Sequence, residues 1–446
     1  MASFLKRKEN SASLENHFSG INIGLEEEMI MTKDADNEVD SAEAEVAQIE
    51  AAENVVAAAD QTADMIEENN GELDQNGVVA VDNLMTAAQN IAQDDGVNNP
   101  GDPLNEADTE KLIPVTESSG KFYVSIETFK ETFSKIKKKI LEICNSIWAR
   151  IKAAYRNYFG AYSSISKRAA DTVTRTENMA GKTIPTENKT FDITSGAQYL
   201  CLGDAQPTTN ATGINNVLAV VEKVANKKIL TAMKELGKSL NESVKKADFS
   251  NDTEKEAGLT AVLESIKKYV SNVKSSTFPE AFLAHTKFTC ELPSTTPNST
   301  GTEKVNIAFQ YRATISEGET KLKDSYKFTT MTVTDAKGIA SKIGDIVKNL
   351  KAFETGMDDL EKYQKELATA SNALETKANK AEADNDKEDT SSDTVTGIVS
   401  AYNALVRSNT YFANNVTTLA KALKLSTATL QNALHWCNKS LDLHKS

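Results

Sequence analysis

The sequence has few of the residues that build catalytic and metal sites. It holds only four histidines and four cysteines among 446 residues, and the cysteines follow no Cys-x-x-Cys spacing. A glycine-rich phosphate loop, a Gly-x-Ser-x-Gly elbow and a His-Glu-x-x-His motif are all missing. We therefore expect no enzyme activity, no cofactor and no metal. His435, Cys437 and His444 form the nearest approach to a ligand cluster, but Cys437 continues an apolar helical stripe, so we expect it to pack in the core.

Long hydrophobic runs are also missing. The chain contains no run of 18 apolar residues, and its basic start, MASFLKRKEN, is followed by polar residues rather than the apolar core of a signal peptide. The expected product is made in the cytosol, with its four cysteines as reduced thiols. Aromatic residues make up only 6% of the chain, so not every part need pack tightly.

Charge is distributed very unevenly. Residues 1–127 hold six Lys or Arg against 28 Asp or Glu, a net charge of −22, whereas residues 128–446 carry +8. The overall charge of −14 hides this division. Such asymmetry suggests a nucleic-acid or membrane contact masked by an acidic arm. The alternative is an acidic tail that only improves solubility.

The acidic part is expected to be a disordered or weakly helical leader, residues 1–127. Apolar residues are thinly spaced over 36–69, which predicts one or two exposed helices of marginal stability. A further short helix is expected over 78–91. Residues 94–127 are interpreted as a linker, because they contain three of the eight prolines and many turn-forming residues.

A basic amphipathic helix is predicted in the next region, residues 128–180. Apolar residues recur from Phe129 to Tyr158 in steps of three and four, and Thr128 with Glu131 would form a capping box. The remaining faces are basic and are the candidate polyanion-binding surface: Lys130, Lys135, Lys137, Lys138, Lys139, Arg150, Lys152 and Arg156. The helix would contact DNA phosphates without sequence preference, or an anionic membrane surface. Alternatively, it is an ordinary bundle helix with a lysine-rich outer face.

Residues 181–446 are predicted to form a helical body with a β-meander at about 285–334. Helical patterns cover 213–247 and 254–276, and short strands are expected at 190–194 and 198–202. Alternating residues predict the three meander strands within 288–292, 305–315 and 326–333. A near-heptad stripe runs over 339–374, followed by a charged loop at 380–393 and a last helical pair over 398–441. The expected fold is α+β, predominantly helical, with long helices packed as hairpins or a bundle.

Two passages resemble a known family. One is the acidic opening, LENHFSGINIGLEEEM, and the other is the basic stretch FYVSIETFKETFSKIKKKILEICNSIWARIKAAYRNYFGAY. Together they are similar to the internal head proteins of giant tailed bacteriophages, in which an acidic propeptide precedes a basic helix and a helical body. The similarity is recognisable over about residues 1–200, and beyond that it lies only in general character.

The resemblance implies proteolytic maturation by a phage prohead protease, which cuts after glutamate in a Ser/Ala/Gly-x-Glu context. Matching triplets in the leader end at Glu15, Glu26, Glu43, Glu53 and Glu127. Glu127 is the favoured site, because it lies where the −22 and +8 segments meet.

The expected function is therefore that of a non-enzymatic internal virion protein. It would be packaged in the phage head with capsid or prohead core proteins, and its basic body would contact the packaged DNA, with ejection alongside the DNA left open. One alternative is a scaffolding or structural capsid protein that acts through protein–protein contacts. Another is a membrane-active effector that uses the basic helix.

Overall fold

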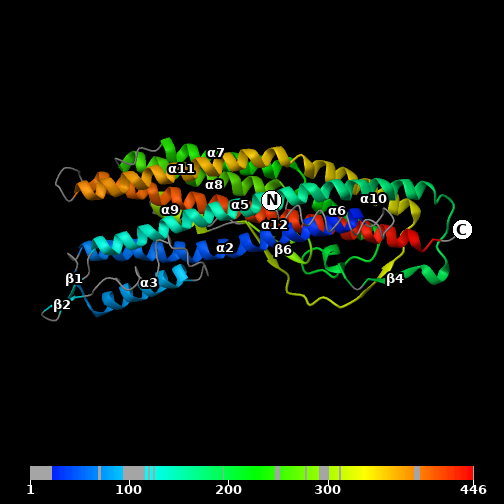
Figure 1. Ribbon diagram of the computed structural model, residues 1–446, viewed down its shortest axis with the longest axis horizontal. Helices are drawn as coiled ribbons and strands as arrows, with labels where there is room; N and C mark the ends of the chain where they lie inside the picture. Colours follow the sequence, from blue (N-terminus) through cyan, green and yellow to red (C-terminus); the bar gives the residue numbers. More distant parts are fainter. Residues whose placement is uncertain are drawn as a thin grey trace.

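Long helices lying side by side dominate the molecule. The computed structural model describes residues 23–68, 72–93, 116–118, 121–123, 126–193, 195–246, 252–276, 279–290, 301–310, 313–385 and 392–444. Figure 1 shows an elongated bundle in which the longest helices run along the long axis. The helices are α2 (Ile23–Glu68), α3 (Gln75–Gln93), α5 (Ile126–Glu177), α6 (Ala211–Val224), α7 (Lys227–Lys246), α8 (Asp252–Ser276), α9 (Gly301–Gln310), α10 (Val333–Lys351), α11 (Glu354–Asn385) and α12 (Ser392–Asp442).

Helices α5 and α12 form the centre of the bundle and run parallel to each other. Trp148 stacks on Phe412, the Thr427 hydroxyl bonds to Tyr162, and Thr172 bonds to Asn438. Both sequences allow long helices, because neither contains proline and apolar residues recur every three or four positions. The buried residues of α5 include most of the stripe predicted from Phe129 to Tyr158. The predicted basic helix is therefore confirmed, although it begins at Ile126, two residues before the expected cap at Thr128.

Three small antiparallel sheets accompany the helices in the described part of the chain. Their strand orders are β1-β3-β2, β4-β8 and β5-β6-β7. The strands are β1 (Glu72–Leu73), β2 (Thr116–Ser118), β3 (Lys121–Tyr123), β4 (Thr190–Ile193), β5 (Ala281–Phe282), β6 (Thr286–Thr289), β7 (Thr314–Glu317) and β8 (Tyr326–Thr329). The predicted class, mainly helical with small antiparallel sheets, is confirmed. The end of the expected linker is not irregular, because β2 and β3 lie within it.

The predicted three-stranded meander is wrong in detail. Residues 301–310 form α9 instead of a strand, because Val305, Ala308 and Phe309 also share one face of a helix and are all buried. Strand β8 pairs with β4 rather than with β7, and it brings Phe328 opposite Phe191. Residues 197–200 form a short 3-10 helix where a strand was expected.

Helix α12 is one continuous helix and not the expected helical pair. Its Ser426, Thr427 and Thr429 look like turn formers in sequence. The hydroxyls of Ser426 and Thr427 instead bond back to the carbonyls of Ala422 and Leu423, at 2.7 and 2.8 Å. Such bonds satisfy the polar side chains within the helix, so it continues without a break.

The leader differs from the expectation in how much of it is buried. Helix α2 was predicted to be marginal and exposed, yet its apolar residues are buried against the bundle from Ala35 to Ile66. It packs on α5 and α12, with α3 on its outer side, as Figure 1 shows. The expectation of exposure is therefore wrong for residues 35–66. In the described part of the chain, no helix is long and apolar enough to cross a membrane.

The turn between β5 and β6 holds two non-glycine residues in the left-handed region. Ala284 and His285 have φ values of 53° and 61°, and the amide of Thr286 bonds to the carbonyl of Leu283 at 3.2 Å. A type I′ turn of this kind favours Asn at its first central position. Alanine in this region costs about 1–2 kcal/mol.

We predict that Ala284→Asn raises the thermal midpoint of unfolding, with a gain of up to about 1 kcal/mol, because asparagine tolerates positive φ. The matched control is Ala352→Asn, since Ala352 is similarly half-buried but has a right-handed φ of −68°. Calorimetry of both variants measures the difference. An equal change in the two midpoints would contradict the assigned strain.

Candidate functional site

The strongest concentration of complementary charge lies where α2 meets α5 and α12. Helix α2 contains fifteen acidic residues and one basic residue. Among its described side chains, nine apolar ones are buried, and five of these are alanine: Ala35, Val39, Ala42, Ile49, Ala52, Val56, Ala59, Ala63 and Ile66. Carboxylates flank this stripe on both sides. The stripe is therefore narrow and its borders are acidic.

One acidic border contacts α5 through Arg150. The guanidinium binds Glu45 at 2.7 Å through Nε and Glu38 at 3.3 Å through Nη1. Glu45 also accepts a hydrogen bond of 2.9 Å from the hydroxyl of Ser146. The hydrogen bond to Glu45 raises the pKa of Arg150. These side chains are between 17% and 38% exposed, so water screens the pairs only partly.

The other acidic border contacts α12. Lys424 binds Asp40 at 2.6 Å, and Lys421 binds Glu43 at 3.1 Å. Further along, the Asn414 amide donates to Glu50 at 2.9 Å. The residue numbers decrease on α12 as they increase on α2, so the two helices are antiparallel. We call the six residues Ser146, Arg150, Tyr158, Asn414, Lys421 and Lys424 the α2-binding face.

A half-buried carboxylate completes the contact. The hydroxyl of Tyr158 donates a hydrogen bond of 2.7 Å to Asp36. Burial raises the pKa of the Asp36 carboxyl, and the bond from Tyr158 offsets part of that rise. Burial and the neighbouring carboxylate also raise the pKa of Tyr158. The pair therefore fixes the helix register at the cost of some desolvation.

The predicted polyanion-binding residues do not form one open surface. Lys137 is buried, with 8% of its surface exposed. Arg150 is covered by α2, and Lys152 binds Glu361 of α11 at 2.5 Å. Among the described candidates only Lys138 and Arg156 are exposed, while Lys135 and Lys139 are half-buried. The side chain of Lys130 lies outside the described residues.

Two cations of this contact were not among the residues predicted from the sequence. Lys421 and Lys424 lie on α12, which has no acidic residue between Asp393 and Asp442. Two lysines one turn apart on a long helix without acids require countercharge from elsewhere. That absence of acids was the available signal, although the lysine run on α5 is denser and more conspicuous.

The cleavage candidates lie in different settings. Glu15 is outside the described residues, and Glu26, Glu43 and Glu53 lie within helix α2. Glu43 is bound to Lys421. Glu127 is the second residue of α5 and so belongs to its first turn, where backbone amides lack partners within the helix.

No arrangement in the described residues resembles a catalytic centre. Cys437 is buried and its thiol contacts the sulfur of Met331 at 3.8 Å, which confirms its predicted place in the core. The ring of His444 bonds to the Ser440 carbonyl. Among the described residues, no group of three potential ligands could hold a metal ion.

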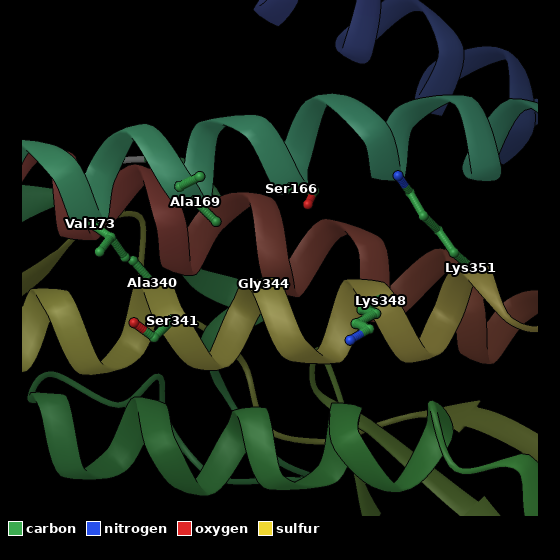
Figure 2. Close-up of a pocket in the computed structure, with 9 residues that line it drawn as sticks. Ser166, Ala169, Val173, Ala340, Ser341, Gly344, Lys348 and Lys351 are labelled. Carbon is green, nitrogen blue, oxygen red and sulfur yellow. The ribbon is translucent and has the colours of Figure 1, made fainter.

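A shallow hollow lies between α5 and α10. Its volume is about 320 Å³, and small side chains line most of it, including Ala169, Ala340 and Gly344. Figure 2 shows these residues on the two facing helices, with Lys351 reaching from α10 towards α5. The lining contains no acidic residue or histidine, and its two ionisable side chains are Lys348 and Lys351.

Comparison with known proteins gives one match. A family model described as phiKZ-like phage internal head proteins matches residues 27–430. The matched region includes α2 as well as the basic helix and most of α12. No curated protein and no solved structure matches.

We predict that Arg150→Met loosens α2. Methionine keeps an apolar stem but removes both ion pairs, a loss on the order of 1 kcal/mol. Amide hydrogen exchange near residues 38–45 should then become about fivefold faster in low salt, and the difference should shrink in 0.5 M salt. Arg156→Met is the matched control, since Arg156 is exposed on the same helix. Equal exchange in both variants would show that Arg150 does not hold α2.

Proposed function

The chain belongs to the family of phiKZ-like phage internal head proteins, and on that basis we propose that it is a precursor whose acidic leader masks a basic body and is cut from it by proteolysis. The family places the protein inside the phage head as a structural component. The proposal adds three steps: neutralisation of the basic helix, cleavage between leader and body by the prohead protease, and contact between the body and packaged DNA. None of these steps requires catalysis by this chain.

The observation that carries the proposal is the pairing of α2 with the α2-binding face. Arg150, Lys421 and Lys424 all bind carboxylates of α2. In the uncut chain these cations are therefore paired with carboxylates and partly covered by α2. A body of net charge +8 with its cations covered would bind DNA weakly during assembly, because the phosphate contacts that dominate non-specific affinity are missing.

The arrangement of the small sheet supports Glu127 as the point of cleavage. Strands β1, β3 and β2 form one sheet, and all three precede residue 127. A cut after Glu127 would therefore break no strand pairing and would separate the −22 segment from the +8 body. Only the first turn of α5 must open for a protease, and terminal turns open most easily.

The scaffolding alternative has one specific observation in its favour. Three large apolar side chains are exposed in the described residues, and all belong to the leader: Ile30, Met31 and Val79. They offer the leader a contact with prohead core or capsid proteins, which exposed apolar surface commonly mediates. Leader docking to core proteins is compatible with later cleavage.

The membrane alternative receives no support. The apolar stripe of α5 is buried inside the protein by α2, α10 and α12. A helix that inserts into a bilayer surface needs a free apolar face. We therefore do not propose an anionic membrane as a partner.

We predict that the protein from mature particles begins at Thr128. Intact-mass and N-terminal analysis of purified particles measure this directly. Phage carrying Glu127→Ala should retain the precursor, because the protease requires glutamate before the cut. Glu117→Ala is the matched control: Glu117 lies nearby but follows Val115 at the position where Ser, Ala or Gly is required.

Other outcomes discriminate between the alternatives. A start at Asn16, Glu27, Ala44 or Asn54 would keep maturation but move the site to another triplet. An intact terminus at Met1 or Ala2 in infectious particles would reject maturation and would favour the scaffolding function.

A further inference from the structure

We propose that the cut leader remains bound to the body as a noncovalent subunit, and that the phosphates of double-stranded DNA displace it from the α2-binding face. This inference rests on the proposed function, but it concerns the fate of the leader after cleavage and not whether cleavage occurs. Proteolysis would then make the leader separable from the body. Binding of DNA would displace the leader and expose the cations beneath it.

Retention is expected from the length of the contact. The buried stripe of α2 runs from Ala35 to Ile66. At about 1.5 Å per residue this extends over roughly 47 Å of helix. A cut near residue 127 leaves every one of these contacts intact, since none depends on the covalent connection. The leader also keeps its own support, because α3 and the sheet β1-β3-β2 lie on the same side of the cut.

The contact is nevertheless suited to displacement. Five of the nine buried apolar residues of α2 are alanine, which buries little surface per residue. The charged borders therefore carry a large share of the specificity. Their pairs are partly exposed, so salt and competing anions can reach them.

The two helices that carry these cations offer them no carboxylate nearby in the sequence. Helix α12 has no acidic residue between Asp393 and Asp442, and α5 has none between Glu142 and Asp171. Arg150, Lys421 and Lys424 thus obtain their paired carboxylates from α2. Once α2 leaves, phosphate is a fitting replacement, because Arg binds it through two parallel hydrogen bonds and Lys as a point charge.

DNA also repels α2 itself, which makes rebinding of the leader less favourable. It carries one charge per about 1.7 Å of its axis, a denser array than the fifteen acidic residues spread over the 46 residues of α2. With fifteen acidic residues and a single lysine, α2 would be repelled by nearby DNA. Competition for the α2-binding face and repulsion of α2 therefore favour the same exchange. The surface of α5 and α12 directly beneath α2 is apolar and would not bind phosphate. We therefore assign the phosphate contacts to the cations beside that surface.

The experiment uses the full chain with a site-specific protease sequence inserted between Val124 and Ser125. After cutting, size-exclusion chromatography in 50 mM NaCl should show leader and body eluting together. Addition of a 30-base-pair duplex should release the leader, and the body should elute with the DNA. An equal concentration of an uncharged polymer should release nothing.

A triple variant assigns the surface. Replacing Arg150, Lys421 and Lys424 with Gln should cause loss of the leader after cutting even without DNA. It should also weaken DNA binding by the body about tenfold or more and reduce its salt slope by about 0.9 for each lost contact. The charge-matched control replaces Lys234, Lys268 and Lys337, which pair with Asp359, Glu235 and Glu177 away from α2. The control should keep its leader.

Three results would overturn the inference. Separation of the fragments in low salt without DNA would reject retention, and a leader that stays bound in excess DNA would reject displacement. Equal DNA affinity in the triple variant and its control would reject the assigned face. All three are independent of the natural terminus found in particles, which tests the proposed function separately.

Discussion

The contact of α2 with α5 and α12 combines two interactions that respond differently to the surroundings. Burial of the apolar stripe is insensitive to salt, whereas the ion pairs of Arg150, Lys421 and Lys424 weaken as ions screen them. The stripe is rich in alanine, which limits the apolar surface that its burial removes from water. In our proposal such a contact holds in the uncut chain and is still open to competition by a polyanion. The masking, the cut and the exchange with DNA that we propose all depend on this balance.

Helix α12 makes that contact possible because it is rigid and central. Its buried polar residues, including Ser408, Thr427 and Asn409, bond mainly to carbonyls of their own helix. Asn409 also links α12 to α11 through Ser371. Buried polar groups with partners help to specify one packing register. This register places Lys424 opposite Asp40 and Lys421 opposite Glu43.

Net charge alone gives a poor description of this protein. The basic body of residues 128–446 presents few of its predicted contacts openly, because Lys137 is buried and Lys152 binds Glu361. Accessible charge changes only when a neighbouring helix leaves. In the function that we propose, an internal head protein of this kind is made beside nucleic acid in the host and binds it later, after the acidic leader is cut and displaced.

Residue spacing and composition were enough to predict the helical class, the two charge blocks and the basic helix from Phe129 to Tyr158, because both act locally along the chain. Which charges meet is settled only in the folded chain. Arg150 was a candidate for DNA contact, yet Glu38 and Glu45 reach it from more than 100 positions earlier in the chain. The pattern of residues 301–310 fits a strand as well as a helix. The structure selects the helix, because it buries Val305 and Phe309 on one helical face. Which residues form ion pairs and which are buried depends on packing between distant parts of the chain, and local sequence patterns do not contain that information.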